Sequence, residues 1–379
     1  NLEQRIGQLI MLTAYAEQAA NEQVILSQIE KAEIGGILFL KTTPQRLFEL
    51  GQDYQKASKV PLFIGLDGEN GLSFRLSDSP VYPHKIALGA IRNDSMLYQM
   101  GREIGQQCRM LGINLNFGPV ADINSNIDNP VINYRSFGTD PKNVSRKSIL
   151  LAKGMQDERI IVSAKHFPGH GDTSLDSHYD LPIINHNYQR IDSLELIPFR
   201  DIINAGINGI MTAHIALPKI DTSGVAATLS KIIIHDILRD SLNFKGIVFS
   251  DAMNMKGVLH NSTETEAIVR ALQAGVDVVE FVTDPVKAIE AIRLAIEKGE
   301  LTQAQIDEKC LKVLRAKEWA QMHRTKPLPQ NAAKKLNQQQ FALTQRKLVE
   351  QSLALVQNNL QTIPLQRFDT LKAATIAIG

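Results

Sequence analysis

The stretch KHFPGHGDTSLDSH, residues 165–178, concentrates side chains that could transfer a proton or bind a metal. Its ionisable residues are Lys165, His166, His170, Asp172, Asp176 and His178. A proline and two glycines lie among them, and these residues favour a bent loop over a helix. The composition of the stretch is compatible with a zinc site, with a proton-transfer site and with a polar turn that has only a structural role.

A zinc site would use the histidines. His166 and His170 are four residues apart, a spacing that places two ligands on one face of a helix. Pro168 and Gly169 lie between them, so the helix that would give this spacing its meaning is not expected. We therefore expect neither a metal nor another cofactor. A metal-dependent barrel hydrolase that uses His166, His170 and His178 stays open as an alternative.

Proton transfer accounts for more of the stretch. Asp176 precedes His178 by two residues, so in a bent loop its carboxylate can hold one ring nitrogen and leave the other for a substrate. Such a partner fixes the tautomer and favours the imidazolium form. Gly169 and Gly171 allow the positive φ values that the bend requires. We therefore predict that His178, held by Asp176, gives a proton to a substrate and later takes one back.

A proton donor is half of a mechanism, and Asp251 is the candidate for the attacking group. It follows the apolar run GIVFS, residues 246–250, which would hold it rigidly. A carboxylate in such a position can attack carbon, as carboxylates do in glycosidases. Capping of the following helix is the structural alternative.

Ionisable residues also follow other apolar runs. The residues found at such ends are Asp67 after LFIGL, Lys165 and His166 after IIVSA, His214 after GIMTA, and Asp251. In a barrel of parallel strands, all carboxyl ends point to one end of the barrel. We therefore expect these side chains to meet in one active site.

The apolar runs predict eight strands. They lie at residues 7–12, 34–40, 62–67, 113–122, 160–167, 209–215, 246–252 and 276–282. Most are continuous rather than alternating, which is typical of strands buried on both faces. Amphipathic segments separate them, including a stripe from Leu97 to Leu111 and a helix that opens at Asp284-Pro285. This alternation predicts an α/β fold, a (β/α)8 TIM-type barrel. An open doubly wound sheet is the alternative, but no GxGxxG motif follows the first strand.

The sequence changes character after Trp319. We expect a TIM-barrel catalytic domain over 1–323, a linker over 324–345, and a C-terminal helix and strand over 346–379. The linker begins within KPLPQNAAKK and is rich in Lys, Gln, Asn and Pro. The helix is expected at 341–357 and the strand in the final LKAATIAIG. This remainder is either the start of a truncated second α/β domain or a short tail docked on the barrel.

Composition limits the possible partners. Of the 379 residues, 44% are hydrophobic and 21% charged, and the net charge is +1, so nothing favours nucleic acid. No run of 18 apolar residues occurs, so no membrane span is expected. Cys108 and Cys310 are far apart and cannot form a disulfide framework. The start at Asn1 favours a removed leader and an exported protein, periplasmic or at the cell surface; the oligomeric state stays open.

The motifs resemble those of the family 3 glycoside hydrolases and, within this family, of the NagZ-type β-N-acetylglucosaminidases. The resemblance covers about residues 1–320. It is carried by KHFPGHGDTSLDSH, NPVINYRSFGTDP (129–141), GLDGENGLSFR (65–75), ELIPFRDIINAGINGIMTAHI (195–215) and FKGIVFSDAMNMKG (244–257).

The resemblance implies roles for individual residues. Asp251 matches the family's catalytic nucleophile, and His178 with Asp176 matches its acid/base pair on a mobile loop. The positions that match sugar-binding residues are Asp67, Arg75, Arg135, Lys165 and His166, and His214 is expected to line the same site. The β-glucosidases of the wider family lack the DSH sequence and take their acid/base from a second domain. The DSH sequence therefore favours a hexosaminidase.

Two stretches depart from the family pattern. DGENGLSFR stands where the family often shows DQEGGRV, so Leu72 replaces an arginine while the spacing from Asp67 to Arg75 is kept. SDAMNMKG stands in place of SDDLSM, with the aspartate retained. These departures affect the expected substrate contacts rather than the class of reaction.

The expected function is that of a retaining β-N-acetylglucosaminidase (β-N-acetylhexosaminidase). It would release terminal β-linked GlcNAc from cell-wall-derived glycans, such as peptidoglycan fragments, through a covalent glycosyl-enzyme. A β-glucosidase or β-xylosidase, a GlcNAc phosphorylase of the same family and a non-catalytic sugar-binding barrel are the alternatives.

Overall fold

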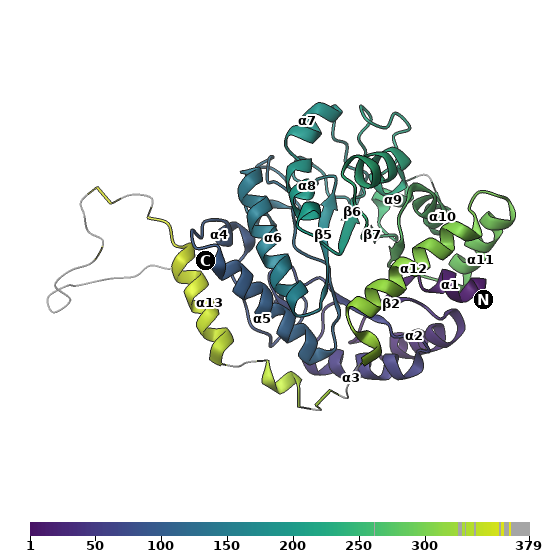
Figure 1. Ribbon diagram of the computed structural model, residues 1–379, viewed down its shortest axis with the longest axis horizontal. Coiled ribbons are helices and arrows are strands. Elements are labelled where there is room, and N and C mark those ends of the chain that lie inside the picture. Colours follow the sequence, from purple (N-terminus) through teal and green to yellow (C-terminus); the bar gives the residue numbers. More distant parts are fainter. Residues whose placement is uncertain are drawn as a thin grey trace.

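The computed structural model describes residues 1–260, 262–324, 328–329, 331–336, 339–355, 358–359 and 364. Its strands form one parallel sheet in chain order: β1 Met11–Ala14, β2 Gly36–Phe39, β3 Phe63–Leu66, β4 Leu115–Asn116, β5 Ile161–Phe167, β6 Gly209–Thr212, β7 Ile247–Ala252 and β8 Val278–Glu280. A parallel bridge between Ile10 and Val279 joins the last strand to the first. The sheet therefore closes, and the prediction of a (β/α)8 TIM-type barrel is confirmed (Figure 1).

Helices surround the barrel (Figure 1). The α-helices are α1 Leu2–Gly7, α2 Ala19–Ala32, α3 Pro44–Ala57, α4 Lys85–Gly89, α5 Ser95–Leu111, α6 Pro141–Asp157, α7 Tyr188–Ser193, α8 Leu196–Asn204, α9 Lys256–Leu259, α10 Glu264–Ala274, α11 Pro285–Glu297, α12 Gln303–Trp319 and α13 Gln339–Ser352. A π-helix, η4 Ile232–Ser241, connects β6 to β7. Short 3₁₀ turns are η1 Leu72–Phe74, η2 Asn133–Arg135, η3 Ala227–Leu229, η5 Met322–Arg324 and η6 Ala333–Lys335.

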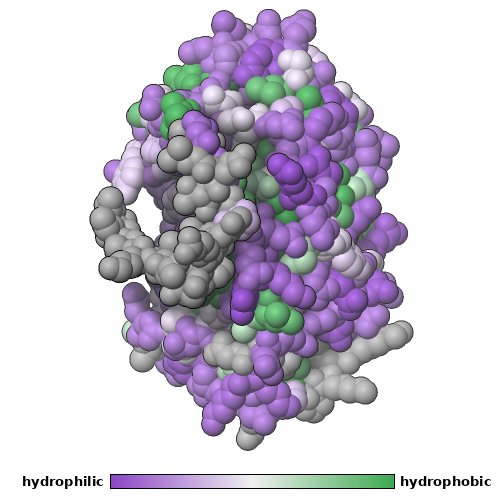
Figure 2. Space-filling view, turned by 90° about the vertical axis from the view of Figure 1, so that its left-hand side faces the viewer, coloured by the Kyte–Doolittle hydropathy of each residue, from purple (hydrophilic) through white to green (hydrophobic). Residues whose placement is uncertain are grey.

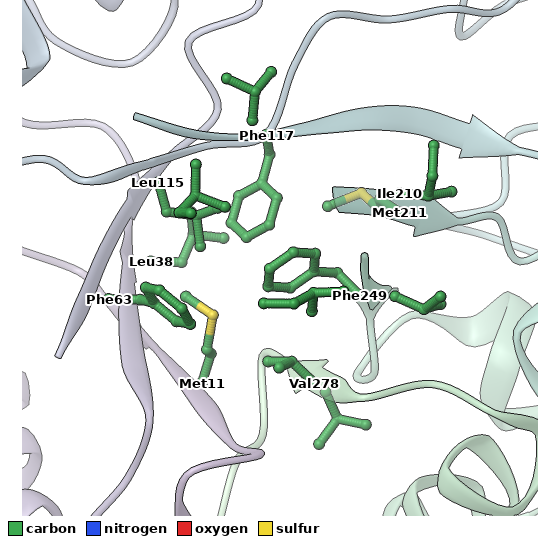
Figure 3. Packing of buried hydrophobic residues seen from close by; sticks show 14 of the residues in the cluster. Met11, Leu38, Phe63, Leu115, Phe117, Ile210, Met211, Phe249 and Val278 are labelled. Atoms are coloured by element: carbon green, nitrogen blue, oxygen red, sulfur yellow. The ribbon is translucent and has the colours of Figure 1, made fainter. Parts of the chain in front are cut away.

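Apolar side chains from different strands fill the interior of the barrel. Met11, Phe63, Phe249 and Val278 converge there from β1, β3, β7 and β8 (Figure 3). The rings of Phe117 and Phe249 meet edge to face, with centroids 5.3 Å apart. All five side chains are fully buried. Because interior residues and helix-facing residues are both buried, the strands read in sequence as continuous apolar runs.

All eight strands are found, with limits that differ from the predicted ones, and the differences are largest for the first and the fourth strand. The first was expected at residues 7–12, but α1 ends at Gly7 and β1 begins at Met11. The short helix forms because Asn1 Oδ1 accepts a hydrogen bond from Gln4 N at 2.9 Å in a reciprocal capping box. The fourth was expected at 113–122, but β4 is only two residues long. The rest of that segment still follows β5, since Lys165 N donates to Pro119 O at 3.1 Å.

Both helices singled out from the sequence are present. The stripe that begins at Leu97 is the buried face of α5, which ends at Leu111. Helix α11 begins at Pro285, and the Asp284 side chain accepts a hydrogen bond from Lys287 N at 3.1 Å. These predictions succeed because capping and helical spacing are local properties of the sequence.

The C-terminal helix α13 lies along the outside of α5, on the left of Figure 1. Its own side chains Phe341 and Leu348 are buried. Thr344 Oγ1, also on α13, donates a hydrogen bond to the buried Glu103 of α5 at 2.7 Å. The face of the molecule shown in Figure 2 is mainly hydrophilic, with hydrophobic residues in small separate groups. No helix in the described part of the chain is long and apolar enough to cross a membrane.

The division into domains stays a prediction. Helix α13 begins inside the segment expected as a linker, 324–345, and it ends before the limit expected for the helix, residue 357. Most of the expected tail, 346–379, including the strand LKAATIAIG, lies outside the described residues.

Candidate active site

The structure brings the strand-end residues together at the carboxyl end of the barrel, which we call the mouth. Asp67 follows β3, Lys165 and His166 belong to β5, His214 follows β6, and Asp251 is the next-to-last residue of β7. Asp67, Lys165, His166 and His214 are each at most 7% exposed. Parallel strands place their carboxyl ends at one end of the barrel, and this arrangement makes the mouth a polar layer above the apolar interior.

Asp67 is held by two cations. Its Oδ1 accepts a hydrogen bond from Lys165 Nζ at 2.7 Å, and its Oδ2 accepts one from Arg75 at 2.7 Å. Burial would raise the pKa of Asp67, but Lys165 and Arg75 lower it below its usual value. Asp67 is therefore an ionised acceptor, suited to sugar hydroxyl groups. Arg75 Nε is buried without a partner among the described residues, so it is a donor that a ligand can use.

Glu69 is a site residue that sequence reasoning missed. Arg135 donates to both of its carboxylate oxygens, at 2.7 and 3.0 Å, and Lys165 Nζ lies 3.0 Å from Oε1. A third cation, Lys85, lies 3.5 Å away. Burial alone would raise the pKa of Glu69, but Arg135 and the two lysines hold it well below its usual range. Glu69 thus fixes Arg135 and Lys165 in place.

Asp122 was also missed. Its Oδ2 lies 2.7 Å from His166 Nδ1, and its Oδ1 accepts a hydrogen bond from His170 N at 2.7 Å. The opposite nitrogen of His166, Nε2, lies 3.4 Å from Arg135. Asp122 therefore orients the His166 ring toward the mouth. The signal was present in the sequence, since Asp122 ends an apolar run in the same way as Asp67 and Asp251.

Replacement of Asp122 tests this positioning role. Burial raises the pKa of Asp122, but His166 lowers it below the unfolded value, so its charged form stabilises the native state above about pH 4. We expect Asp122→Asn to lower the free energy of unfolding by about 1–3 kcal/mol at pH 7. That deficit should shrink as the pH falls below about 4, because wild type then loses the same charge. Thermal unfolding of both proteins between pH 7 and 3 measures it, with the exposed Asp128→Asn as control. A deficit that does not change with pH would contradict this role.

His170 braces the loop rather than facing a ligand. Its Nδ1 lies 2.9 Å from Thr173 Oγ1 and its Nε2 lies 3.1 Å from Ser177 Oγ. Burial, followed by the neighbouring His166, lowers the pKa of His170 to about 4, so the ring is neutral at physiological pH.

The geometry does not favour a zinc site in this loop. The rings of His166 and His170 stand edge to face with centroids 5.8 Å apart, and His178 Nδ1 is bonded to Asp176. The ring nitrogens therefore do not converge on one point. In the described part of the chain, a group with metal-ligand spacing is formed instead by the exposed residues His235, Asp236 and Asp240.

The pair predicted from the DSH sequence forms. Asp176 Oδ1 lies 2.6 Å from His178 Nδ1 and also accepts the His178 backbone N–H at 2.9 Å. The His178 side chain is 62% exposed. Ser177, just before it, is anchored on both sides: by His170 and by Gly257 N, which donates to Ser177 O at 3.3 Å. Because Gly257 follows β7, this anchor ties the loop with His178 to the strand that carries Asp251.

The two loop glycines serve different purposes. Gly169 has φ +130°, as predicted. The prediction of a positive φ at Gly171 is wrong. A Cβ atom there would lie 1.6 Å from the carbonyl oxygen of Ile123, so glycine is needed for the close approach of two backbone segments.

Asp251 is a partly exposed carboxylate in the otherwise buried strand β7. Its Oδ1 accepts a hydrogen bond from Ala252 N at 2.7 Å. Burial would raise the pKa of Asp251, but His214 and His166, followed by Ala252 N and Lys165, lower it to about 2. His214 is itself neutral at physiological pH because burial lowers its pKa, so it carries no charge there.

His214 positions the strand that carries Asp251. Its Nδ1 lies 2.9 Å from Thr228 Oγ1, and its Nε2 lies 3.0 Å from the carbonyl oxygen of Ala252. The side chain is fully buried. The contacts of His214 fix the backbone next to Asp251, and its expected role in lining the sugar site stays a prediction.

A comparison with known proteins agrees with this geometry. Residues 1–316 match the model of the glycosyl hydrolase family 3 N-terminal domain. The chain belongs to this family. Two similar curated proteins are beta-hexosaminidase A of Pseudoalteromonas piscicida, 34% identical over 66% of this chain, and a protein of Cellulomonas fimi named beta-N-acetylglucosaminidase/beta-glucosidase, 28% identical over 96%.

The family 3 chain is also similar to solved structures. One is the family 3 beta-N-acetylglucosaminidase of Paenibacillus sp. str. FPU-7, with a TM-score of 0.88 and 32% identity; the match covers 93% of this chain and 69% of that one. The chain spans only 46% of the Pseudoalteromonas relative and 66% of the Cellulomonas relative. This chain therefore corresponds to only part of each of these two relatives, the part that contains the family 3 barrel.

Proposed function

We propose that this chain carries the active site of a retaining β-N-acetylglucosaminidase. The observation that supports the proposal best is an ionised, partly exposed Asp251 together with a histidine on an adjacent loop, where Asp176 Oδ1 lies 2.6 Å from His178 Nδ1. These are the two groups that a double displacement requires: a nucleophile, and an acid that later acts as a base. The names of the relatives from Pseudoalteromonas and Paenibacillus support the choice of GlcNAc as the sugar.

The proposed reaction has two steps. In the first, Asp251 Oδ2 attacks the anomeric carbon while His178 Nε2 gives its proton to the leaving oxygen, so the glycosidic bond breaks and a glycosyl ester forms. In the second, the neutral His178 takes a proton from water, whose oxygen attacks the same carbon and displaces Asp251. Two inversions release β-GlcNAc with net retention. Asp251 Oδ1, bonded to Ala252 N, keeps the carboxylate in position.

The other residues of the mouth would bind the sugar. Asp67 accepts hydrogen bonds from ring hydroxyl groups, and Arg75 and Arg135 donate to their oxygens. Lys165 contacts Asp67 and His166 lies 3.4 Å from Arg135, and both act electrostatically on Asp251, so they would serve both the sugar and the nucleophile. The natural substrate we propose is a cell-wall-derived glycan with terminal β-linked GlcNAc, such as a peptidoglycan fragment.

A panel of 4-nitrophenyl β-glycosides tests the sugar class. We expect kcat/KM for the GlcNAc derivative to exceed that for the glucoside and the xyloside at least about tenfold, because a recognised substituent contributes roughly 1–3 kcal/mol. Activity on the glucoside alone would contradict the proposal.

A second candidate function is that of an enzyme that acts on both GlcNAc and glucose derivatives, as the name of the Cellulomonas relative states for that protein. In that case the two derivatives would be hydrolysed at comparable rates. Assays with and without inorganic phosphate separate hydrolysis from phosphorolysis, since a phosphorylase would need phosphate and release GlcNAc 1-phosphate.

A further inference from the structure

Glu280 is a carboxyl group at the mouth that the reaction above does not use. It ends β8, two residues after Val278, whose side chain points into the interior of the barrel (Figure 3). In the neighbouring strand β7, Asp251 stands two residues after Phe249, which pairs with Val278. Because side chains alternate along a strand, Glu280 faces the interior one layer closer to the mouth than Val278. Strand β7 shifts register between Phe249 and Ala252, and Ala252 pairs with Glu280, so Asp251 stands next to the partner of Glu280 and its charge acts on that side chain.

The Glu280 side chain is buried, and one of its two oxygens is unpaired in the described part of the chain. It is 1% exposed, and its Oε1 has no hydrogen-bond partner among the described residues. The backbone is firmly held, since Glu280 N donates to Ser250 Oγ at 3.0 Å. Buried polar groups are nearly always hydrogen-bonded, and an unpaired one is costly. A ligand in the mouth is therefore a suitable partner for this carboxyl group.

The surroundings of Glu280 disfavour its charged form. The carboxylates of Asp67 and Asp251 face it from β3 and β7, and the cation that faces it, Lys165 on β5, already binds Asp67 at 2.7 Å and Glu69 at 3.0 Å. Burial first, and then Asp67 and Asp251, raise the pKa of Glu280 well above its usual value; Lys165 opposes them without outweighing them. A protonated carboxyl group has an O–H donor that an ionised one lacks.

We propose that Glu280 is a substrate-binding residue that donates a hydrogen bond, as an uncharged carboxylic acid, to a hydroxyl oxygen of the bound sugar. The inference rests on the proposed function, because it takes the mouth as the sugar site. Asp67 is ionised and can only accept from a sugar hydroxyl, whereas Glu280 supplies a donor beside it. Together they recognise a hydroxyl group both as a donor and as an acceptor, which makes Glu280 a determinant of sugar specificity.

Two substitutions of similar size separate the contributions of charge and hydrogen bonding. Glu280→Gln keeps a donor without a charge, and Glu280→Leu removes the donor. For the 4-nitrophenyl GlcNAc derivative, we expect Glu280→Gln to stay within a few fold of wild type and Glu280→Leu to lose roughly 10- to 100-fold in kcat/KM. Equal losses in both variants would overturn the neutral-donor role, and no loss in either would overturn the substrate contact.

Substrates that lack one hydroxyl group distinguish the loss of a specific hydrogen bond from Glu280 from a general distortion of the site. With GlcNAc glycosides deoxygenated at C3, C4 or C6, the difference between wild type and Glu280→Leu should disappear for one of the three. The same loss on all of them would contradict a specific contact. Circular dichroism and thermal unfolding of each variant check that the barrel is intact.

Infrared spectroscopy tests the protonation state independently of turnover. The carbonyl stretch of a protonated carboxylic acid should be present in wild type at pH 7 and absent in Glu280→Gln. Identical spectra would overturn the proposal for Glu280 even in an active enzyme. If wild type hydrolyses no glycoside, the proposed function fails, and calorimetric titration of the wild type and Glu280→Leu proteins with GlcNAc still tests the contact: weaker binding in the variant supports it, and equal binding contradicts it.

Discussion

Asp251→Asn is expected to lower kcat on β-GlcNAc glycosides by at least about 10⁴-fold, the order of loss when a nucleophile is removed. The amide cannot form the glycosyl ester, and it no longer places a negative charge beside the anomeric carbon. The fold should persist, because an asparagine oxygen can still accept the hydrogen bond from Ala252 N that Asp251 Oδ1 accepts at 2.7 Å. Steady-state kinetics on a purified variant measure the loss. Asp128→Asn, an exposed substitution, should retain wild-type turnover.

Chemical rescue strengthens this test. In Asp251→Gly, the space left by the carboxylate gives a small anion access to the anomeric carbon. Sodium azide should then restore part of the turnover of a substrate with a good leaving group and yield the α-glycosyl azide. A β-glycosyl azide, or turnover of Asp251→Asn close to wild type, would contradict the nucleophile assignment.

The second large effect is expected for His178→Ala, and it should depend on the leaving group. General acid catalysis contributes about 10²–10⁴-fold, so cleavage of natural β-glycosides should slow by that order. A dinitrophenyl leaving group needs no proton, so formation of the glycosyl-enzyme from that substrate should stay close to the wild-type rate. Pre-steady-state release of the phenol measures the first step separately from the second.

The control for this experiment is His235→Ala, which removes an exposed histidine from the π-helix η4, and it should leave both substrates unaffected. Equal losses on good and poor leaving groups would contradict the acid role of His178. Asp176→Asn should fall between wild type and His178→Ala, because it weakens the 2.6 Å contact that orients the ring without removing the ring.

The barrel could be predicted because its signals are local. Each buried strand is a continuous apolar run, and helices such as α11 carry their own caps, as Asp284 shows. The contact between Asp176 and His178 could be predicted for the same reason, since the two residues are two positions apart in one loop. The first strand was placed too early because the capping box of Asn1 and Gln4 turns the segment before it into a helix.

The contacts that other site residues make could not be predicted, because they join distant segments of the sequence. Glu69 meets Arg135 across 66 positions of sequence, and Asp122 meets His166 across 44. Gly171 is needed because the backbone at Ile123 approaches it, which no local pattern reveals. The sequence signal for Glu280 is that an acidic residue interrupts the apolar run VDVVEFV.

The central claim is that Asp251 forms a covalent bond to GlcNAc that His178 helps to break. Mass spectrometry of His178→Ala, quenched during turnover of the dinitrophenyl β-GlcNAc glycoside, tests it most directly. Because the first step proceeds and the second lacks its base, we predict that the protein gains the mass of one N-acetylglucosaminyl residue, on the peptide that contains Asp251. Absence of this adduct while phenol is released in a burst, or an adduct on another residue, would contradict the account.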